Sequence, residues 1–85
     1  MKIQLTVQVH SDRPIERPRP YFKGVFKSFR NCWELVDVTG PTMTVKSDVF
    51  TVSDEVDPKD FSVKMFDCLT PNMFTTNVTR TYSVL

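Results

Sequence analysis

Apolar and polar residues alternate strictly at the start of the chain. Ile3, Leu5, Val7 and Val9 are apolar, and every residue between them is polar. Successive side chains of a β-strand point to opposite faces of a sheet, so a period of two is typical of a strand with one buried face. The pattern therefore predicts a strand at the N-terminus, with its even-numbered residues in solvent.

Prolines at positions 14, 18 and 20 end this alternation. Proline has no backbone N–H and favours an extended geometry for the residue before it. We therefore predict that residues 11–20 form an extended arm, partly of polyproline type, rather than a helix or a central strand. Arginines at positions 17 and 19 each precede a proline and are expected to face solvent on this arm.

Residues 21–38 fit two alternatives. Their apolar residues recur at spacings of three and four, as on one face of an amphipathic helix, and Gly40-Pro41 is a typical helix stop. The segment is also rich in poor helix formers and contains Gly24, which favours two strands at about 21–27 and 32–38. We prefer the helix, because the spacing and the stop signal agree.

Alternation returns in the second half of the chain. Thr42 to Ser53 reads as a strand or short hairpin in which the apolar positions change from odd to even, and such a change of phase predicts a bulge or a tight turn. Phe61, Val63 and Met65 alternate again and predict a further strand. A turn at 70–72 and a last strand ending near Val84 complete the pattern.

These elements predict a small single domain, 1–85, of the α+β class. One amphipathic helix would pack on an antiparallel sheet of four to five strands, and an all-β small barrel is the alternative. The chain has 85 residues, no alanine and only two glycines, and its many valines and threonines favour strands. No segment has the roughly 20 apolar residues of a membrane span. We expect a cytoplasmic protein, in the host cytoplasm or the virion if it is viral, without a membrane partner.

Positive charge is concentrated between residues 13 and 30. This window holds six of the eleven basic residues and has a net charge of +5, whereas the rest of the chain sums to −4. Phosphate binding needs clustered cations, and stacking on single strands needs exposed aromatic rings. Tyr21, where the arm ends, is the best candidate for an exposed ring. The predicted site residues are Arg13, Arg17, Arg19, Tyr21, Lys23, Lys27 and Arg30.

Residues that could support catalysis or metal binding are sparse. His10 is the only histidine, and Ser11 and Asp12 follow it directly, so these three side chains point apart and cannot form a catalytic relay. The acidic residues at positions 54, 55, 57 and 60 lack the spacing and glycine of a calcium loop. Cys32 and Cys68 are isolated and do not make a zinc site. We expect no enzymatic activity, no metal and no cofactor.

Two short stretches carry a family resemblance. Arg19-Pro20-Tyr21 at the end of the basic arm, and Pro58 to Phe61 before a late alternating run, resemble features of the small single-stranded-DNA-binding proteins of filamentous phages. The resemblance implies a dimeric, open five-stranded barrel. The turn glycines of that family are missing here, and the helical spacing of 21–38 has no counterpart in it.

The sequence thus supports two hypotheses, both without chemistry. The first is a single-stranded nucleic-acid-binding protein that uses the basic arm and the basic helix face. The second is a structural or assembly protein, viral or phage in origin, whose proline-rich arm docks on neighbouring subunits. The expected partners are single-stranded nucleic acid or an acidic protein surface, together with further copies in a homo-oligomer.

Overall fold

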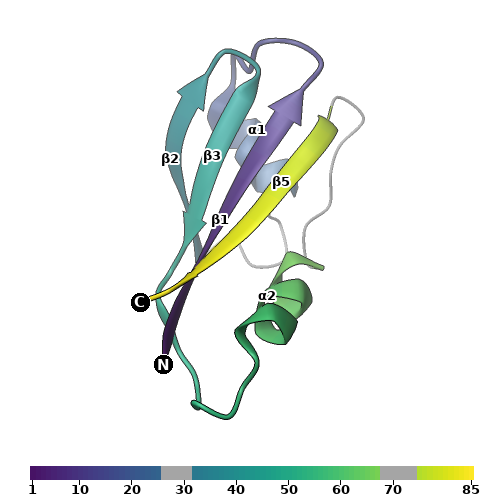
Figure 1. Ribbon diagram of the computed structural model, residues 1–85. Coiled ribbons are helices and arrows are strands. Elements are labelled where there is room, and N and C mark those ends of the chain that lie inside the picture. The colour runs from purple at the N-terminus through teal and green to yellow at the C-terminus, as the bar shows by residue number, and fades with distance from the viewer. Residues whose placement is uncertain (26–31, 68–74) are drawn as a thin grey trace.

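A single antiparallel sheet organises the protein (Figure 1). The computed structural model describes residues 1–25, 32–67 and 75–85, with residues 23–25 described by their backbone alone. In chain order the elements are β1 (Lys2–Ser11), α1 (Pro18–Val25), β2 (Trp33–Thr39), β3 (Thr42–Ser47), β4 (Phe50–Thr51), α2 (Pro58–Phe66) and β5 (Thr75–Val84). The domain is therefore a small mixed α+β domain, and its described residues form two helices rather than the one predicted.

The sheet is open. Strand β1 pairs with β3 and β4 along one side and with β5 along the other, and β2 pairs with β3. Strands β2 and β5 lie at opposite margins, so the five-stranded sheet is not closed into a barrel. The prediction of an antiparallel sheet of four to five strands is confirmed, and the alternative of a barrel is wrong.

Strand β1 is the central strand, as its alternating sequence predicted. Thr6 pairs with Lys46 of β3 on one side and with Thr81 of β5 on the other. All four apolar residues of β1 are completely buried, whereas Lys2 and Gln8 on the opposite face are exposed. Because a strand paired on both sides satisfies its backbone groups within the sheet, β1 can lie in the middle of the sheet with one face against the core.

The change of apolar phase after Val45 corresponds to a bulge. Strand β3 follows β1 as far as Lys46, opposite Thr6, and β4 resumes at Phe50, opposite Ile3. Residues 47–49, at the end of β3 and before β4, therefore face only residues 4 and 5 of β1. The bulge turns the even-numbered Phe50 to the same face as the odd-numbered Val45, as the sequence predicted.

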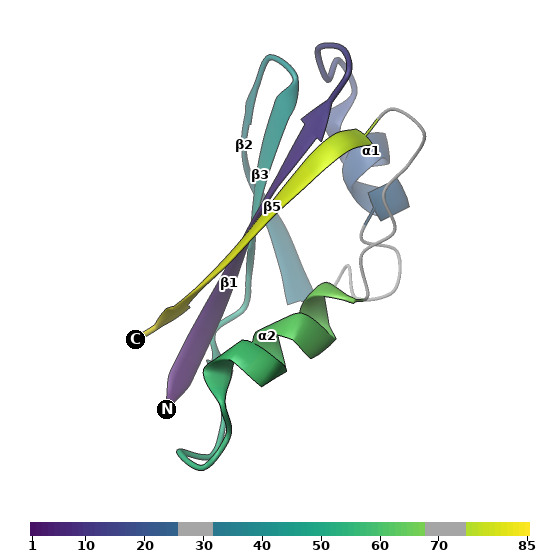
Figure 2. The same cartoon turned by 45° about the vertical axis from the view of Figure 1, so that its right-hand side comes forward.

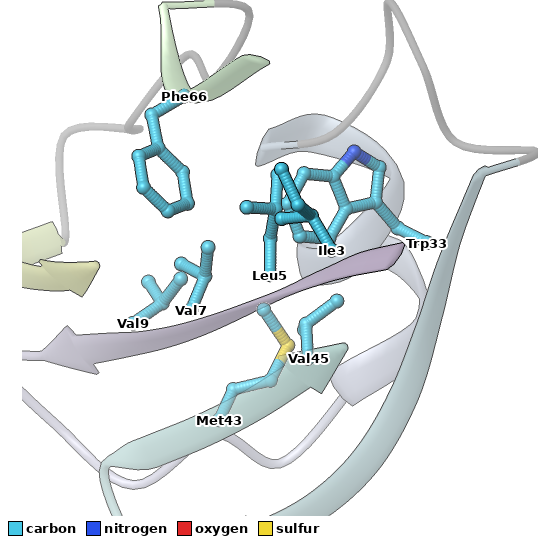
Figure 3. Close-up of a cluster of buried hydrophobic side chains, with 8 residues drawn as sticks. All are labelled: Ile3, Leu5, Val7, Val9, Trp33, Met43, Val45 and Phe66. Atoms are coloured by element: carbon cyan, nitrogen blue, oxygen red, sulfur yellow. The ribbon is translucent and has the colours of Figure 1, made fainter. Parts of the chain in front are cut away.

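Both helices cover the same face of the sheet (Figure 2). Between them and the sheet lies a cluster of buried apolar side chains, in which those of β1 and β3 point toward the rings of Trp33 and Phe66 (Figure 3). The cluster consists of Ile3, Leu5, Val7, Val9, Trp33, Met43, Val45 and Phe66. A core of this size is small, so single contacts within it carry a large share of the stability.

A continuous helix over residues 21–38 is wrong. Helix α1 starts earlier, at Pro18, and residues 33–39 form β2, which pairs with β3 from Trp33 to Thr39. The first amides of a helix have no partner within it, so prolines at its first and third positions lose no helical hydrogen bond. Residues 18–20 are therefore helical and not part of an extended arm. Residues 26–31 lie outside the described part.

The predicted helix stop is instead the turn of the β2–β3 hairpin. Gly40 lies between the two strands with φ of +56°, in the left-handed region that favours glycine. A hairpin turn and a helix end both use glycine at such an angle, so this residue could not decide between the two alternatives.

The predicted strand at 61–65 is also wrong, because these residues belong to α2. The Asp57 carboxylate accepts a hydrogen bond from the N–H of Lys59 at 2.9 Å and caps the helix, and Pro58 occupies its first turn. Ser62 and Phe66, four residues apart, are buried on one face, whereas Val63 is half exposed. The helix also removes the late strand on which the phage-protein resemblance depended.

Candidate nucleic-acid interface

The segment between β1 and α1 is fixed to the protein's own hairpin. The N–H of Ser11 donates to the carbonyl of Pro41 at 2.8 Å, and that of Ile15 donates to the carbonyl of Gly40 at 3.0 Å. The half-buried side chain of Ile15 packs against the core cluster. These contacts hold the arginines on either side of Ile15 in defined positions on the surface.

An open pocket of about 640 Å³ lies between this segment and α1. Two arginines, Arg13 and Arg17, line it together with the ring of Tyr21, and Glu16 is the acidic residue among its walls. The complete lining is Ser11, Arg13, Pro14, Ile15, Glu16, Arg17, Pro20 and Tyr21. The pocket therefore combines cationic groups, an aromatic ring and small apolar surfaces.

Tyr21 is held in place from both ends. Its hydroxyl and that of Thr75 at the start of β5 are hydrogen-bonded at 2.7 Å, and its ring packs against the core cluster while remaining partly exposed. A ring fixed in this way loses little conformational freedom when a flat group stacks on it. Tyr21 is thus a preorganised wall of the pocket rather than a mobile surface residue.

The start of α1 adds positive potential to the same region. The macrodipole places partial positive charge at a helix N-terminus, where acidic residues are favourable and basic ones are not. The first turn of α1 contains no acidic residue, and Arg17 and Arg19 flank Pro18 at its start. An anion bound here would relieve this unfavourable arrangement of charge.

The three arginines do not all face the same hollow. Arg19 lines a second, smaller pocket of about 380 Å³ together with Phe22, Trp33, Glu34 and Leu35. Arg13 is paired with its neighbour Asp12 at 3.0 Å, and this carboxylate raises the pKa of Arg13 further. The arginines therefore lie around the beginning of α1, two on one side and one on the other.

Four of the seven predicted site residues lie together around the start of α1: Arg13, Arg17, Arg19 and Tyr21. Lys23 belongs to α1, but its side chain lies outside the described part, as do Lys27 and Arg30 altogether. Sequence reasoning missed the anchoring role of Ile15, although a single apolar residue within a charged, proline-rich segment was a usable signal.

The sheet face opposite the helices is polar. Every described residue of β1 on this face is polar, and its cross-strand partners are mainly threonines. The two ring nitrogens of His10 lie 3.2 Å from the hydroxyls of Thr42 and Thr79, so the imidazole bridges the neighbouring strands. This face carries no aromatic side chain among the described residues and offers no stacking surface for bases.

The acidic residues at 54–60 serve the structure of the chain itself. The Asp54 carboxylate accepts a hydrogen bond from the Met1 amino group at 2.6 Å, and this contact lowers the pKa of Asp54. Asp57 caps α2, and Asp60 lies in its first turn, where a negative charge is favourable. No group of three potential metal ligands occurs within the described ranges. Cys32 is partly buried, and Cys68 lies outside the described part.

Neither described helix is long and apolar enough to cross a membrane. Comparison of the chain with protein-family models, with curated proteins and with solved structures gave no match.

Proposed function

We propose that this protein is a non-catalytic binding protein for single-stranded nucleic acid, and that the interface is the surface formed by residues 11–21. The observation that carries the proposal is the convergence of Arg13, Arg17 and Tyr21 on one open pocket at the positive end of α1. Arg19 extends the cationic surface to the other side of the helix.

The electrostatics favour a polyanion with regularly spaced charges. Arginine donates two parallel hydrogen bonds to phosphate. The cations of this surface line two separate pockets rather than one, with Arg13 and Arg17 in the first and Arg19 in the second. Among the described residues, no hydrogen bond or ion pair involves the guanidinium of Arg17 or Arg19. Both groups are exposed and therefore available to successive phosphates.

The pocket favours single strands over duplexes. In a duplex the faces of the bases are stacked on each other, whereas a single strand can place a base against an aromatic side chain. The ring of Tyr21 lines the pocket and is oriented by its hydrogen bond to Thr75. Stacking of this kind is worth about 1–3 kcal/mol per base and depends little on sequence. We therefore expect weak sequence preference.

Fluorescence anisotropy with a labelled oligothymidylate, measured over a series of salt concentrations, tests the proposal. Release of counterions makes log K fall with log salt by about 0.7 for each phosphate contacted on a single strand. Contacts through three arginines predict a slope of about −2, and the double variant R17A/R19A should reduce it by about 1.4. The affinity should fall at least about tenfold.

A charge-matched control separates this site from a general effect of net charge. The double variant K46A/K59A removes the same charge from the polar sheet face and from α2, and both lysines are exposed. It should bind like the parent protein. Equal losses in the two variants, or no binding by the parent protein at low salt, would refute the proposed interface.

The second hypothesis, assembly through the arm, has less support. The hydrogen bonds of Ser11 and Ile15 dock this segment on the hairpin of the same protomer, and its second and third prolines lie in α1. An acidic protein partner would use the same arginines. Binding of the parent protein to polyglutamate, without binding to the oligonucleotide, would indicate such a partner.

A further inference from the structure

Strand β5 is an unprotected edge of the sheet. It pairs with β1 without interruption from Asn77 to Val84, the register shifts between Thr75 and Asn77, and no described strand lies beyond it (Figure 1). Its ten residues include no proline, no glycine and only one charged residue, Arg80. Edge strands usually carry charges, prolines or bulges that prevent pairing with another chain. The outer edge of β5 lacks most of these protections.

The opposite margin is protected in the usual ways. Strand β2 carries the acidic residues Glu34 and Asp37, and its register with β3 shifts between Leu35 and Asp37. A bulge twists an edge strand away from regular pairing, and acidic side chains repel a second copy of the same edge. The register shift of β5 lies at its start, before Asn77, and leaves residues 77–84 regular and without an acidic side chain. The part of β5 from 77 to 84 is therefore the better suited of the two margins for pairing.

The backbone groups that β5 offers can be assigned. The N–H of Leu85 donates to the carbonyl of Lys2 at 2.8 Å, and hydrogen-bonded and non-hydrogen-bonded pairs alternate along an antiparallel ladder. The odd-numbered residues of β5 therefore bond to β1. The N–H and carbonyl groups of the even-numbered residues, Val78, Arg80, Tyr82 and Val84, point to the outer edge.

Apolar side chains at this edge are only half covered. Tyr82 and Val84 are 41% and 52% exposed, although the β1 residues paired with them, Leu5 and Ile3, are completely buried. These side chains lie on the helix-covered face of the sheet, at the point where the core reaches its margin. A further strand beside β5 would cover them.

We infer that β5 pairs with β5 of a second copy of this chain, in antiparallel orientation, with Thr81 on the two-fold axis. This register brings outward-facing backbone groups together and pairs Arg80 with Tyr82 of the partner subunit. Val78 then lies opposite Val84 of the partner subunit, and Thr79 opposite Ser83 of the partner subunit. The two sheets become one continuous sheet across a symmetric interface.

The chemistry of the strand selects this register and this occupant. Pairing centred on Arg80 would place two guanidiniums directly opposite each other, which is unfavourable. Centring on Thr81 instead gives two arginine–tyrosine contacts of cation–π type, two valine pairs on the same face, and hydroxyl pairs on the polar face. The strand is thus complementary to itself, and the proposal is independent of nucleic-acid binding.

Sedimentation equilibrium over a wide range of concentration tests the dimer. The expected mass is twice the 9.9 kDa of the chain. Substitution T81K would place two lysines face to face on the axis and should shift the protein to the monomer, whereas Q8K, at an exposed position of central β1, should leave the dimer intact. A monomer at millimolar concentration for the parent protein would overturn the proposal.

Engineered cysteines test the register without relying on loss of association. Facing residues of a non-hydrogen-bonded pair approach closely, so T81C should form an intersubunit disulfide under mild oxidation. T79C and S83C should cross-link to each other in a mixture of the two variants, but not in either variant alone. The parent protein, which retains Cys32 and Cys68, measures the background. Efficient cross-linking of T79C with itself would contradict the register.

Discussion

The hydroxyl of Ser47 accepts a hydrogen bond from the backbone N–H of Leu5 at 2.8 Å and donates one to the carbonyl of Asp48 at 2.8 Å. Ser47 is the last residue of β3 and is almost completely buried. The bulge between β3 and β4 interrupts the backbone ladder at this point. The serine side chain therefore supplies the partner that the central strand lacks there.

Replacing Ser47 by alanine should destabilise the protein by about 1–3 kcal/mol, because the buried N–H of Leu5 would have no acceptor. Chemical denaturation followed by circular dichroism measures this change. The matched control is T51V on β4, which removes an exposed hydroxyl and keeps the branched side-chain shape, so that the free energy of unfolding should hardly change. Equal stability of the two variants would show that the ladder closes without the hydroxyl.

The Asp57 cap predicts a second effect on stability. Substitution D57A removes the acceptor for the N–H of Lys59 and should cost about 0.5–2 kcal/mol, with loss of helical signal from α2. Asparagine caps helices nearly as well as aspartate, so D57N should retain most of the stability. If D57N lost as much as D57A, the charge near the helix start would matter more than the hydrogen bond.

The backbone angle of Gly40 predicts a loss of stability on substitution that does not come from a clash with neighbouring residues. Its φ of +56° is unfavourable for other residues, but a Cβ atom added there would meet no atom within 4 Å. Substitution G40A should therefore destabilise the hairpin by roughly 1–2 kcal/mol. G40N should cost less, since asparagine tolerates this region better. Thermal or denaturant unfolding of the two variants gives the comparison, and an equal loss would indicate a contact not described above.

The Met1–Asp54 ion pair predicts a dependence on pH. The amino group lowers the pKa of Asp54 below its ordinary value of 3.8 in the folded protein. The contact therefore adds to the stability of the folded protein at pH values above 3.8. This contribution is lost as the pH falls through the lowered pKa of Asp54. Acetylation of the Met1 amine should raise the pKa of Asp54 again. An NMR titration of the carboxyl carbon measures it, and an unchanged pKa after acetylation would contradict the pairing.

The alternation of apolar and polar residues correctly predicted β1 and the bulge between β3 and β4. The alternation in β1 required one buried face, and the change of phase after Val45 required a bulge. The prediction failed at 21–38, where helical spacing joined residues of two elements, Phe22 of α1 and Trp33 of β2, that both pack against the core. It failed again at Phe61, because the alternation masked the capping signal of Asp57 and Pro58.

The sequence predicted the exposure of the arginines near the candidate site but not how they are arranged in space. Charge clustering identified Arg13, Arg17 and Arg19 correctly as exposed groups. Their grouping around the start of α1 depends on Pro18 opening the helix and on the two hydrogen bonds to the β2–β3 turn. Contacts between segments so far apart in the sequence leave no local pattern.

The most direct test of the proposed interface is a titration of isotope-labelled protein with oligothymidylate, followed by amide and arginine side-chain NMR. The largest shift changes should occur in residues 11–21, with the ring of Tyr21 and the guanidiniums of Arg17 and Arg19 among them. Changes confined to the polar face of β1, β3 and β5, or no change at low salt, would contradict the proposed interface.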